Sequence, residues 1–395
     1  MRRSALLVVC LAVFIDMLGF GIILPTLPFE ATRLGGSGVW VGALLTAYAA
    51  AQFVSAPVLG SLSDRFGRRR LLLLSLAGSM FSLALTGLAD SLLLLLLARV
   101  IAGGFGGAIA IGQAYVVDLT SAKDRTRALG LVGASIGLGF VFGPAIGAAL
   151  AALGLGFAGV SFVAAGVAAV NLALGVALLP RTTSGPEVGR APLARLETLR
   201  VALRRPSLRP ILIAMFAVTF AFASMETTFA LLGAQRFGLT PAGLGVVFAY
   251  IGIVMVGVQG GLVGRVTDRY GDRNVALAGA AALAAGLLVL PFVPAWVGYP
   301  ALGLVAVGQG LLSTTTAALI ARAAGQELGG AFGVGQSAAA AARATGPLLA
   351  GAAFDLGAPL PYVLGALLCI AALSLLATAR TSITPDAPAP VMLPR

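Results

Sequence analysis

Four charged residues lie inside long apolar runs of the sequence: Asp16, Arg99, Glu226 and Arg343. Charges within membrane-spanning segments are unfavourable and typically mark ion pathways or proton relays. Two acids and two bases can also pair and merely hold helices together, so that alternative stays open. The chain has no histidine, which leaves the carboxylates to carry any proton chemistry. We expect Asp16 to be the first candidate for a proton or substrate-cation site and Glu226 the second, because movement of a nearby arginine changes how strongly a buried carboxylate holds its proton.

The apolar runs around these charges are long enough to cross a membrane. The chain of 395 residues is 59% hydrophobic and 10% charged, whereas soluble domains carry about a quarter charged residues. The runs lack the alternation of barrel strands, and helices satisfy their backbone groups internally. The sequence therefore predicts an all-α membrane protein of twelve transmembrane helices in two six-helix, pseudo-symmetric halves. The predicted spans cover residues 5–28, 39–61, 71–89, 92–119, 128–152, 156–180, 210–235, 239–264, 274–294, 297–321, 330–354 and 360–379.

The basic residues are distributed as the topology of a membrane protein requires. A net charge of +12 is also typical of nucleic-acid binders. Most arginines, however, fall in every second connection between the predicted spans, as the positive-inside rule predicts for an even span count. We therefore expect a bacterial-type cytoplasmic (inner) membrane protein with both termini cytoplasmic, contacts with the lipid bilayer and no nucleic-acid partner.

The first apolar run is predicted to be an uncleaved span. It begins like a signal peptide, but it continues past Asp16 to about Pro28 without a small-residue cleavage site. Cys10 and Cys369 both fall in predicted spans, so no disulfide framework is expected.

Internal similarity divides the chain into two halves. "GSLSDRFGRR" at 60–69 is echoed by "GRVTDRYGDR" at 264–273, and "GPAIG" at 143–147 by "GPLLAG" at 346–351. Nearly equal offsets at matching positions indicate a duplication, which is typical of transporters whose halves rock against each other. We predict an N-terminal six-helix bundle over 1–180, a cytoplasmic linker with a basic amphipathic helix over 181–209, and a C-terminal six-helix bundle over 210–395.

Four motifs in order resemble those of the major facilitator superfamily, and more narrowly of its twelve-span drug:proton antiporters, which include the tetracycline exporters. They are "DMLGFGIILPTLP" in the first predicted span, "GSLSDRFGRR" between the second and third, "ARVIAGGFGG" in the fourth and "GASIGLGFVFGPAIG" in the fifth. The resemblance covers essentially the whole chain. It implies a secondary active transporter that works by alternating access and exports small lipophilic compounds in exchange for protons.

The resemblance also implies roles for two sets of residues. The loop motif and its second copy would form a latch between the halves in the outward-facing state, with Asp64 at a neighbouring helix N-terminus and arginines paired to acids at other helix ends. The latch residues are Gly60, Asp64, Arg65, Gly67, Arg68, Asp118, Asp268 and Arg269. The fifth-span motif would form a bent, tightly packed helix that seals the cytoplasmic side. Its residues are Gly133, Gly137, Gly143, Pro144 and Gly147.

Polar and aromatic residues inside the spans are candidates for the substrate cavity. The amides are as consistent with helix–helix hydrogen bonds as with ligand contacts, and the phenylalanines near Glu226 as consistent with packing as with an aromatic wall. These candidates are Gln52, Gln113, Gln259, Gln309, Phe222 and Phe229. The third predicted span offers only the hydroxyls of Ser75, Ser79, Ser82 and Thr86, where tetracycline exporters carry an acid. A broader drug or metabolite exporter is therefore favoured over one for tetracycline itself.

The sequence excludes several other classes of function. A Ser-His-Asp triad is impossible without histidine, and no glycine-lysine phosphate loop is present, so we expect no enzyme, no ATP-driven pump, no cofactor and no metal site. A proton symporter, or a metabolite or sugar exporter on the same fold, remains the alternative function. The expected partners are a small-molecule substrate and protons, and the family resemblance implies a monomer.

Overall fold

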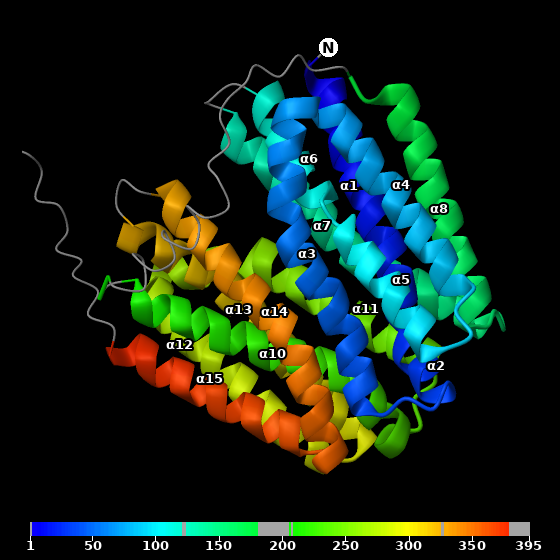
Figure 1. Ribbon diagram of the computed structural model, residues 1–395. Coiled ribbons are helices and arrows are strands. Elements are labelled where there is room, and N and C mark those ends of the chain that lie inside the picture. The colour runs from blue at the N-terminus through cyan, green and yellow to red at the C-terminus, as the bar shows by residue number, and fades with distance from the viewer. Residues whose placement is uncertain (1, 121–123, 181–204, 207, 325–327, 379–395) are drawn as a thin grey trace, which may run out of the picture.

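The protein is helical throughout its described part, as predicted from the sequence. The computed structural model describes residues 2–120, 124–180, 205–206, 208–324 and 328–378 (Figure 1). The predicted amphipathic linker helix lies almost entirely outside these residues. The helices before the linker are α1 (Arg2–Ile23), α2 (Leu27–Arg33), α3 (Gly38–Phe66), α4 (Arg68–Gly87), α5 (Leu92–Gly104), α6 (Ala108–Leu119), α7 (Arg125–Ala152) and α8 (Phe157–Leu178). Those after it are α10 (Arg209–Phe237), α11 (Pro241–Gly257), η1 (Val258–Leu262), α12 (Val263–Val289), η2 (Leu290–Phe292), α13 (Ala295–Ala324), α14 (Leu328–Leu356) and α15 (Leu360–Thr378).

All twelve predicted spans fall on these helices, some of them on more than one, but length and hydropathy alone identify ten candidate spans among the described residues. The difference has two sources. Helices α11, η1, α12 and η2 follow one another directly and count as a single candidate of 52 residues, Pro241–Phe292. Helix α14, which carries Arg343, is not among the ten. The continuous stretch nevertheless bends at Gly271, whose φ of 77° is reached without strain only by glycine.

Several of the predicted spans are irregular where they were expected to be regular. The predicted span 5–28 is broken by a turn at residues 24–26, between α1 and α2. The predicted span 92–119 divides into α5 and α6 at Phe105–Gly107, because Gly103, Gly104, Gly106 and Gly107 weaken the helix there. The predicted span 239–264 contains the π-helix η1 near its end. Interrupted transmembrane helices and π-helical turns often occur at binding sites, because they leave backbone groups free to bind other partners.

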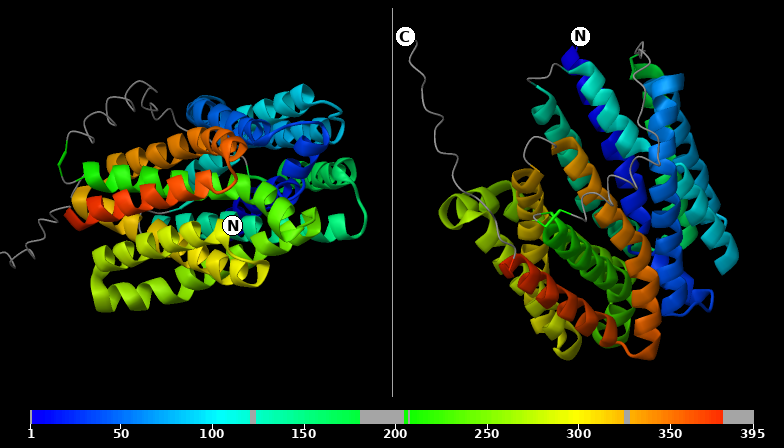
Figure 2. Two further views of the ribbon diagram at one scale, coloured as in Figure 1. Left: turned by 90° about the horizontal axis from the view of Figure 1, so that it is seen from below. Right: turned by 60° about the vertical axis from the view of Figure 1, so that its left-hand side comes forward.

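The helices form two groups that meet along two pairs of helices. Helices α1 to α8 lie on one side and α10 to α15 on the other (Figure 2). The main contacts between them join α3 to α14 and α7 to α11. At these seams the backbones approach closely, since a Cβ added at Gly42 would overlap the Pro347 backbone and one added at Gly245 would overlap Ala148.

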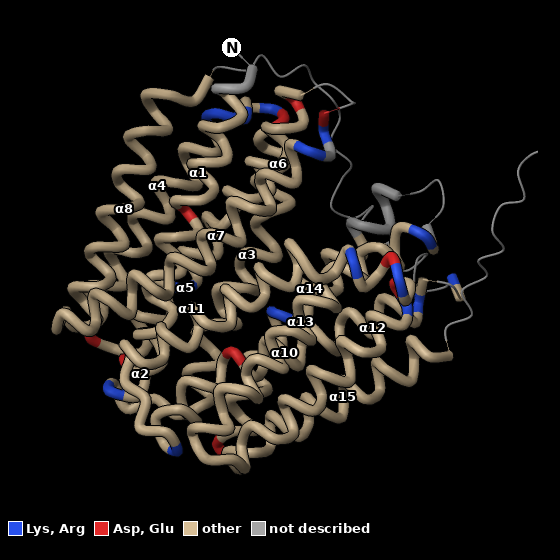
Figure 3. The backbone as a smooth tube through the Cα atoms, turned by 180° about the vertical axis from the view of Figure 1, so that it is seen from behind, with Lys and Arg blue, Asp and Glu red and all other residues tan. Residues whose placement is uncertain are grey.

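The two groups are in contact at one end and apart at the other. We call the end that holds the α3–α4 turn, with Arg68, Arg69 and Arg70, the arginine-rich end. The other end is called the opposite end. Figure 3 shows charged positions gathered near the end of α6 and near α12. Helices α3 and α14 converge at the opposite end and diverge towards the arginine-rich end (Figure 1). The backbones of α3 and α14 are therefore closer together at the opposite end than at the arginine-rich end.

Candidate functional site

Asp16 lies two-thirds of the way along α1 and is only 8% exposed. Its polar neighbour is Ser79 on α4, which lies within hydrogen-bonding range of the carboxylate. The structure describes no ion pair for Asp16. A carboxylate that is removed from water and has a hydroxyl rather than a cation as its partner is suited to gain and lose a proton.

Arg99 is the largest fully buried side chain of the described residues, with 1% of its surface exposed. It extends from α5 to α4, where its Nη2 donates a hydrogen bond to the Thr86 hydroxyl at 2.7 Å. Its Nε has no partner, and the described part of the chain places no carboxylate in an ion pair with it. A buried cation that has only a neutral partner is costly, so its presence requires an explanation other than packing.

Glu226 and Arg343 are opposite charges on the facing helices α10 and α14, and they interact electrostatically. Glu226 is partly exposed and Arg343 is exposed, although both are near the middle of long helices. Arg343 also interacts with Tyr48 on α3, so it faces the space between the two groups of helices rather than the lipid. Through these two residues the second group of helices contributes side chains to the site.

Tyr48 on α3 connects three of these charges, and the sequence analysis missed it. It lies within electrostatic range of Asp16, Arg99 and Arg343. Its ring stacks on Phe20 of α1 with centroids 4.7 Å apart, and its hydroxyl accepts a hydrogen bond from Gln52 at 3.1 Å. A tyrosine four residues before a candidate glutamine, and so on the same helix face, was the available signal. We call Asp16, Tyr48, Arg99, Glu226 and Arg343 the central charged cluster.

Two of the candidate glutamines occupy equivalent places in the two groups. Gln52 donates to the Gly106 carbonyl at 3.1 Å, at the break between α5 and α6. Gln259, in the π-helix η1, donates to the Ser313 hydroxyl at 3.2 Å. The two donors, Gln52 and Gln259, are 207 positions apart in the sequence, and the two acceptors, Gly106 and Ser313, are separated by the same number. The duplicated halves therefore share this polar contact.

The other cavity candidates have more varied environments. Gln113 is exposed, and the Oε1 of Gln309 is buried without a partner. Phe222 is partly buried beside the core of the second group. Phe229 is fully buried and packs near Phe237, so in this conformation it belongs to the core and lines no open space.

The first copy of the loop motif is arranged around Arg68. Its Nε donates to Asp118 Oδ2 at 2.8 Å, and its Nη1 pairs with Asp64 and donates to Ser63 at 2.6 Å. Asp64 therefore has an arginine of its own group as its partner. Arg65 is exposed and lies over the Phe66 ring instead of pairing with an acid in the described residues. Gly67 takes a φ of 95° in the turn between α3 and α4, whereas no atom lies within 4 Å of a Cβ added at Gly60.

The second copy has the same architecture with the charges exchanged. Asp272 pairs with Arg322 at 2.6 Å, and these positions correspond to Arg68 and Asp118 at an offset of 204. Gly271 has a positive φ like Gly67. The predicted latch residues Asp268 and Arg269 are exposed, and Arg269 lies over the Tyr270 ring.

The fifth-span motif packs α7 against two helices from different groups. A Cβ added at Gly143 would lie 2.7 Å from the Gly21 Cα on α1, and one added at Gly147 would overlap the Ile22 backbone. The Pro144 carbonyl lies against Gly245 of α11. Nothing lies within 4 Å of a Cβ added at Gly133 or Gly137, so these two glycines, nearer the arginine-rich end, make no such contact in this conformation.

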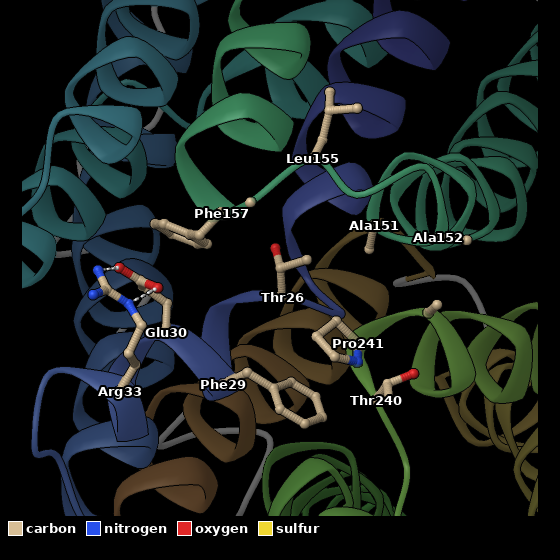
Figure 4. Close-up of a pocket in the computed structure, with 12 residues that line it drawn as sticks. Thr26, Phe29, Glu30, Arg33, Ala151, Ala152, Leu155, Phe157, Thr240 and Pro241 are labelled. Atoms are coloured by element: carbon tan, nitrogen blue, oxygen red, sulfur yellow. Dashed lines mark hydrogen bonds and ion pairs between the residues drawn. The ribbon is translucent and has the colours of Figure 1, made fainter.

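A pocket of about 360 Å³ lies at the opposite end, away from the central charged cluster (Figure 4). Both groups of helices line it: Thr26 and Phe29 come from the first group, and Thr240 and Pro241 from the second. Glu30 and Arg33 form a two-bonded ion pair at its edge, with distances of 2.5 and 2.8 Å. Because that carboxylate is already neutralised by its neighbour, the pocket does not compete with the cluster as a site for proton exchange.

The chain is similar along its whole length to known membrane transporters. The family model of the Major Facilitator Superfamily matches residues 9–265 and 260–393. The chain is 31% identical over 313 residues to the class C tetracycline resistance protein of Escherichia coli, covering 78% of each chain. It is 26% identical over 389 residues to multidrug resistance protein 2 of Bacillus subtilis, covering 95% of this chain and 94% of the relative.

Solved structures agree with this relationship. The crystal structure of the human organic anion transporter MFSD10 (TETRAN) superimposes with a TM-score of 0.69 at 25% identity, covering 95% of this chain and 99% of that one. The nucleoside transporter NupG shares the fold alone, with a TM-score of 0.76 at 12% identity over 94% and 98% of the two chains. The relatives are transporters and not enzymes, and this chain belongs to the Major Facilitator Superfamily, among the relatives of the tetracycline and multidrug resistance proteins.

Proposed function

We propose that this protein exports small lipophilic compounds across a bacterial-type cytoplasmic membrane in exchange for protons. The observation that carries the proposal is the central charged cluster: Asp16 and Arg99 are both buried, neither has a counter-ion among the described residues, and both lie within electrostatic range of Tyr48, which also interacts with Arg343 of the second group. Unpaired buried charges are destabilising, and in a transporter they are explained by a task in ion coupling.

Proton exchange would take place at Asp16. A protonated Asp16 is neutral and is compatible with its buried position beside Ser79. A cationic substrate that entered the cluster would stabilise the ionised form and displace the proton directly. Arg99 would favour proton release whenever movement of α5 or α1 brought it closer to the acid, so the two faces of the membrane would encounter different proton affinities.

The second group of helices would supply the substrate contacts. Glu226 and Arg343 face the space between the groups, and Gln52 and Gln259 present matching amides from the two halves. Phe222 adds apolar surface beside Glu226. An aromatic side chain beside an acid suits a lipophilic and cationic compound, and the multidrug resistance relative is consistent with such substrates.

The conformation fits one state of an alternating-access cycle. The positive-inside rule assigns the arginine-rich end, and with it both termini, to the cytoplasm. The arrangement of α3 and α14 would then correspond to the state that opens to the cytoplasm and is closed to the outside. In the opposite state, bundles 1–180 and 210–395 would rock about the central charged cluster, and a single chain is sufficient for this movement.

The proposal is tested by transport in inverted membrane vesicles with a pH-sensitive dye. A proton gradient is imposed, and lipophilic cations, neutral drugs and sugars are added in turn. We expect proton release with lipophilic compounds, abolished by Asp16→Asn and retained in Asp90→Asn, a matched change at an exposed acid outside the cluster. Release that persists in Asp16→Asn would contradict the coupling role, and substrate uptake in the same direction as protons would establish symport instead.

A further inference from the structure

A carboxylate on one group of helices caps a helix N-terminus on the other. The Oδ1 of Asp355, in the last turn of α14, accepts a hydrogen bond from the Gly38 amide at 2.7 Å, and its Oδ2 accepts one from the Val39 amide at 2.9 Å. These amides begin α3, and the residues that they join are more than 300 positions apart. The usual N-cap position is held by Ser37, whose side chain makes no cap hydrogen bond. Asp355 therefore satisfies amides that α3 leaves free, and its charge is favourable at the positive end of the helix dipole.

The surrounding seam is shaped so that these bonds can form. A Cβ added at Gly38 would lie 2.7 Å from both the Asp355 carboxylate and the Gly351 carbonyl. One turn further along α3 the Gly42 position excludes a side chain in the same way, because the Pro347 backbone occupies that space. The Leu348 amide, directly after Pro347 within α14, donates to the Thr46 hydroxyl at 3.1 Å. Two successive turns of α3 and α14 thus hold each other through polar bonds and close backbone contact.

We propose that Asp355 is the releasable latch of the opposite end, whose two hydrogen bonds must break before the protein can open there. This inference rests on the proposed alternating-access function. The side chain of Asp355 is exposed, so water can solvate the carboxylate as soon as it leaves α3. A latch of this kind holds the closed state firmly and still opens without leaving a buried charge behind.

The latch is tested by distances measured on the purified protein in nanodiscs, without substrate or gradient. The distance between spin labels at Thr32→Cys and Leu356→Cys, both exposed, reports on the opposite end. The distance between labels at Arg70→Cys and Tyr270→Cys reports on the arginine-rich end. The buried native cysteines, Cys10 and Cys369, are replaced by serine. Asp355→Asn should shift the population towards long opposite-end and short arginine-rich-end distances by about tenfold, because charge-assisted hydrogen bonds are lost. Asp355→Glu should restore part of the closed population.

Removal of a donor tests the same bonds from the other helix. Val39→Pro deletes one of the two amides at a first-turn position that tolerates proline, and it should give a smaller shift of the same sign. Asp90→Asn, an exposed acid at the same end of the protein, should change neither distance. Unchanged distance distributions in both Asp355→Asn and Val39→Pro would overturn the latch.

The latch and the proposed function can fail separately, because the distances are measured without transport. Shifted distances with no proton-coupled flux would keep the latch and reject the antiporter. Proton release that depends on Asp16, with unshifted distances, would keep the antiporter and reject the latch.

Discussion

Replacement of Arg99 by methionine should make the protein more stable and at the same time inactive. Even after relaxation, burial of an ion costs several kcal/mol. The single hydrogen bond to Thr86 offsets about 1.5–3 kcal/mol of this, since the donor is charged. Methionine has a similar length and no charge. Without Arg99 the Thr86 hydroxyl still has a hydrogen-bond partner, because it also donates to the Ser82 carbonyl at 2.7 Å. We therefore expect Arg99→Met to raise the free energy of unfolding by about 1–3 kcal/mol, which for a chain of this length is a rise in melting temperature of roughly 1–4 °C.

The two native cysteines provide the assay. Cys10 and Cys369 are both buried, so a thiol-reactive fluorogenic dye reports on unfolding as it gains access to them. Arg99→Lys keeps the charge and should not gain stability, and Leu97→Met, at an exposed position of the same helix, controls for the introduction of methionine itself. Gradient-driven transport should be lost in Arg99→Met. A melting temperature that falls by several degrees in this variant alone would refute the reasoning, because it would show that the charge holds the helices together.

Three further changes test other parts of the site. Tyr48→Phe keeps the stacking on Phe20 but removes the hydroxyl that Gln52 contacts, so it should reduce the coupling of proton release to transport, measured as protons released per substrate, while the melting temperature changes little. Gly147→Leu should force α7 away from α1 and lower the melting temperature by several degrees, through overpacking of about 1–3 kcal/mol or more, whereas Gly137→Leu, which has nothing within 4 Å, should not. Arg68→Ala should leave Asp118 and Asp64 without their cation. A double-mutant cycle of Arg68 with Asp118, measured by thermal unfolding, should give a coupling energy of about 0.5–3 kcal/mol. A value near zero would show that water already screens this pair.

Local patterns in the sequence predicted the features that depend on nearby residues. The helical spans follow from long apolar runs, and the turn at Gly67 follows from a glycine between two helices. The burial of Asp16 and Arg99 was expected from their apolar neighbours. Periodicity could not reveal that α5 would end at Gly104, because the same glycines are compatible with a packed, continuous helix face.

Features that depend on the crossing of distant helices were not predictable from one sequence. Asp355 sits at the end of a predicted span like an ordinary interfacial acid, and only the structure shows that its partners are the first amides of α3. Phe229 shares its helix with Glu226, but the packing of α10 directs it into the core. The sequence pattern also suggested that Asp268 and Arg269 form the second copy of the latch, whereas the ion pair in the structure joins Asp272 and Arg322.

The crossing of α3 and α14 suggests why the protein can rest in either of two states. Each helix carries an acid near its C-terminal end, Asp64 on α3 and Asp355 on α14, and each N-terminus lies at the end where the other helix terminates. Rigid helices that cross cannot be close at both ends, so engagement of one acid with the other helix excludes engagement of the second. In the state described here Asp355 is engaged, while Asp64 is neutralised by Arg68 and does not need the other group. If Asp64 has the latch role that the family resemblance implies, the balance between the two states would depend on how strongly Arg68 competes for Asp64. An arginine of one half would then influence closure at the far side of the membrane.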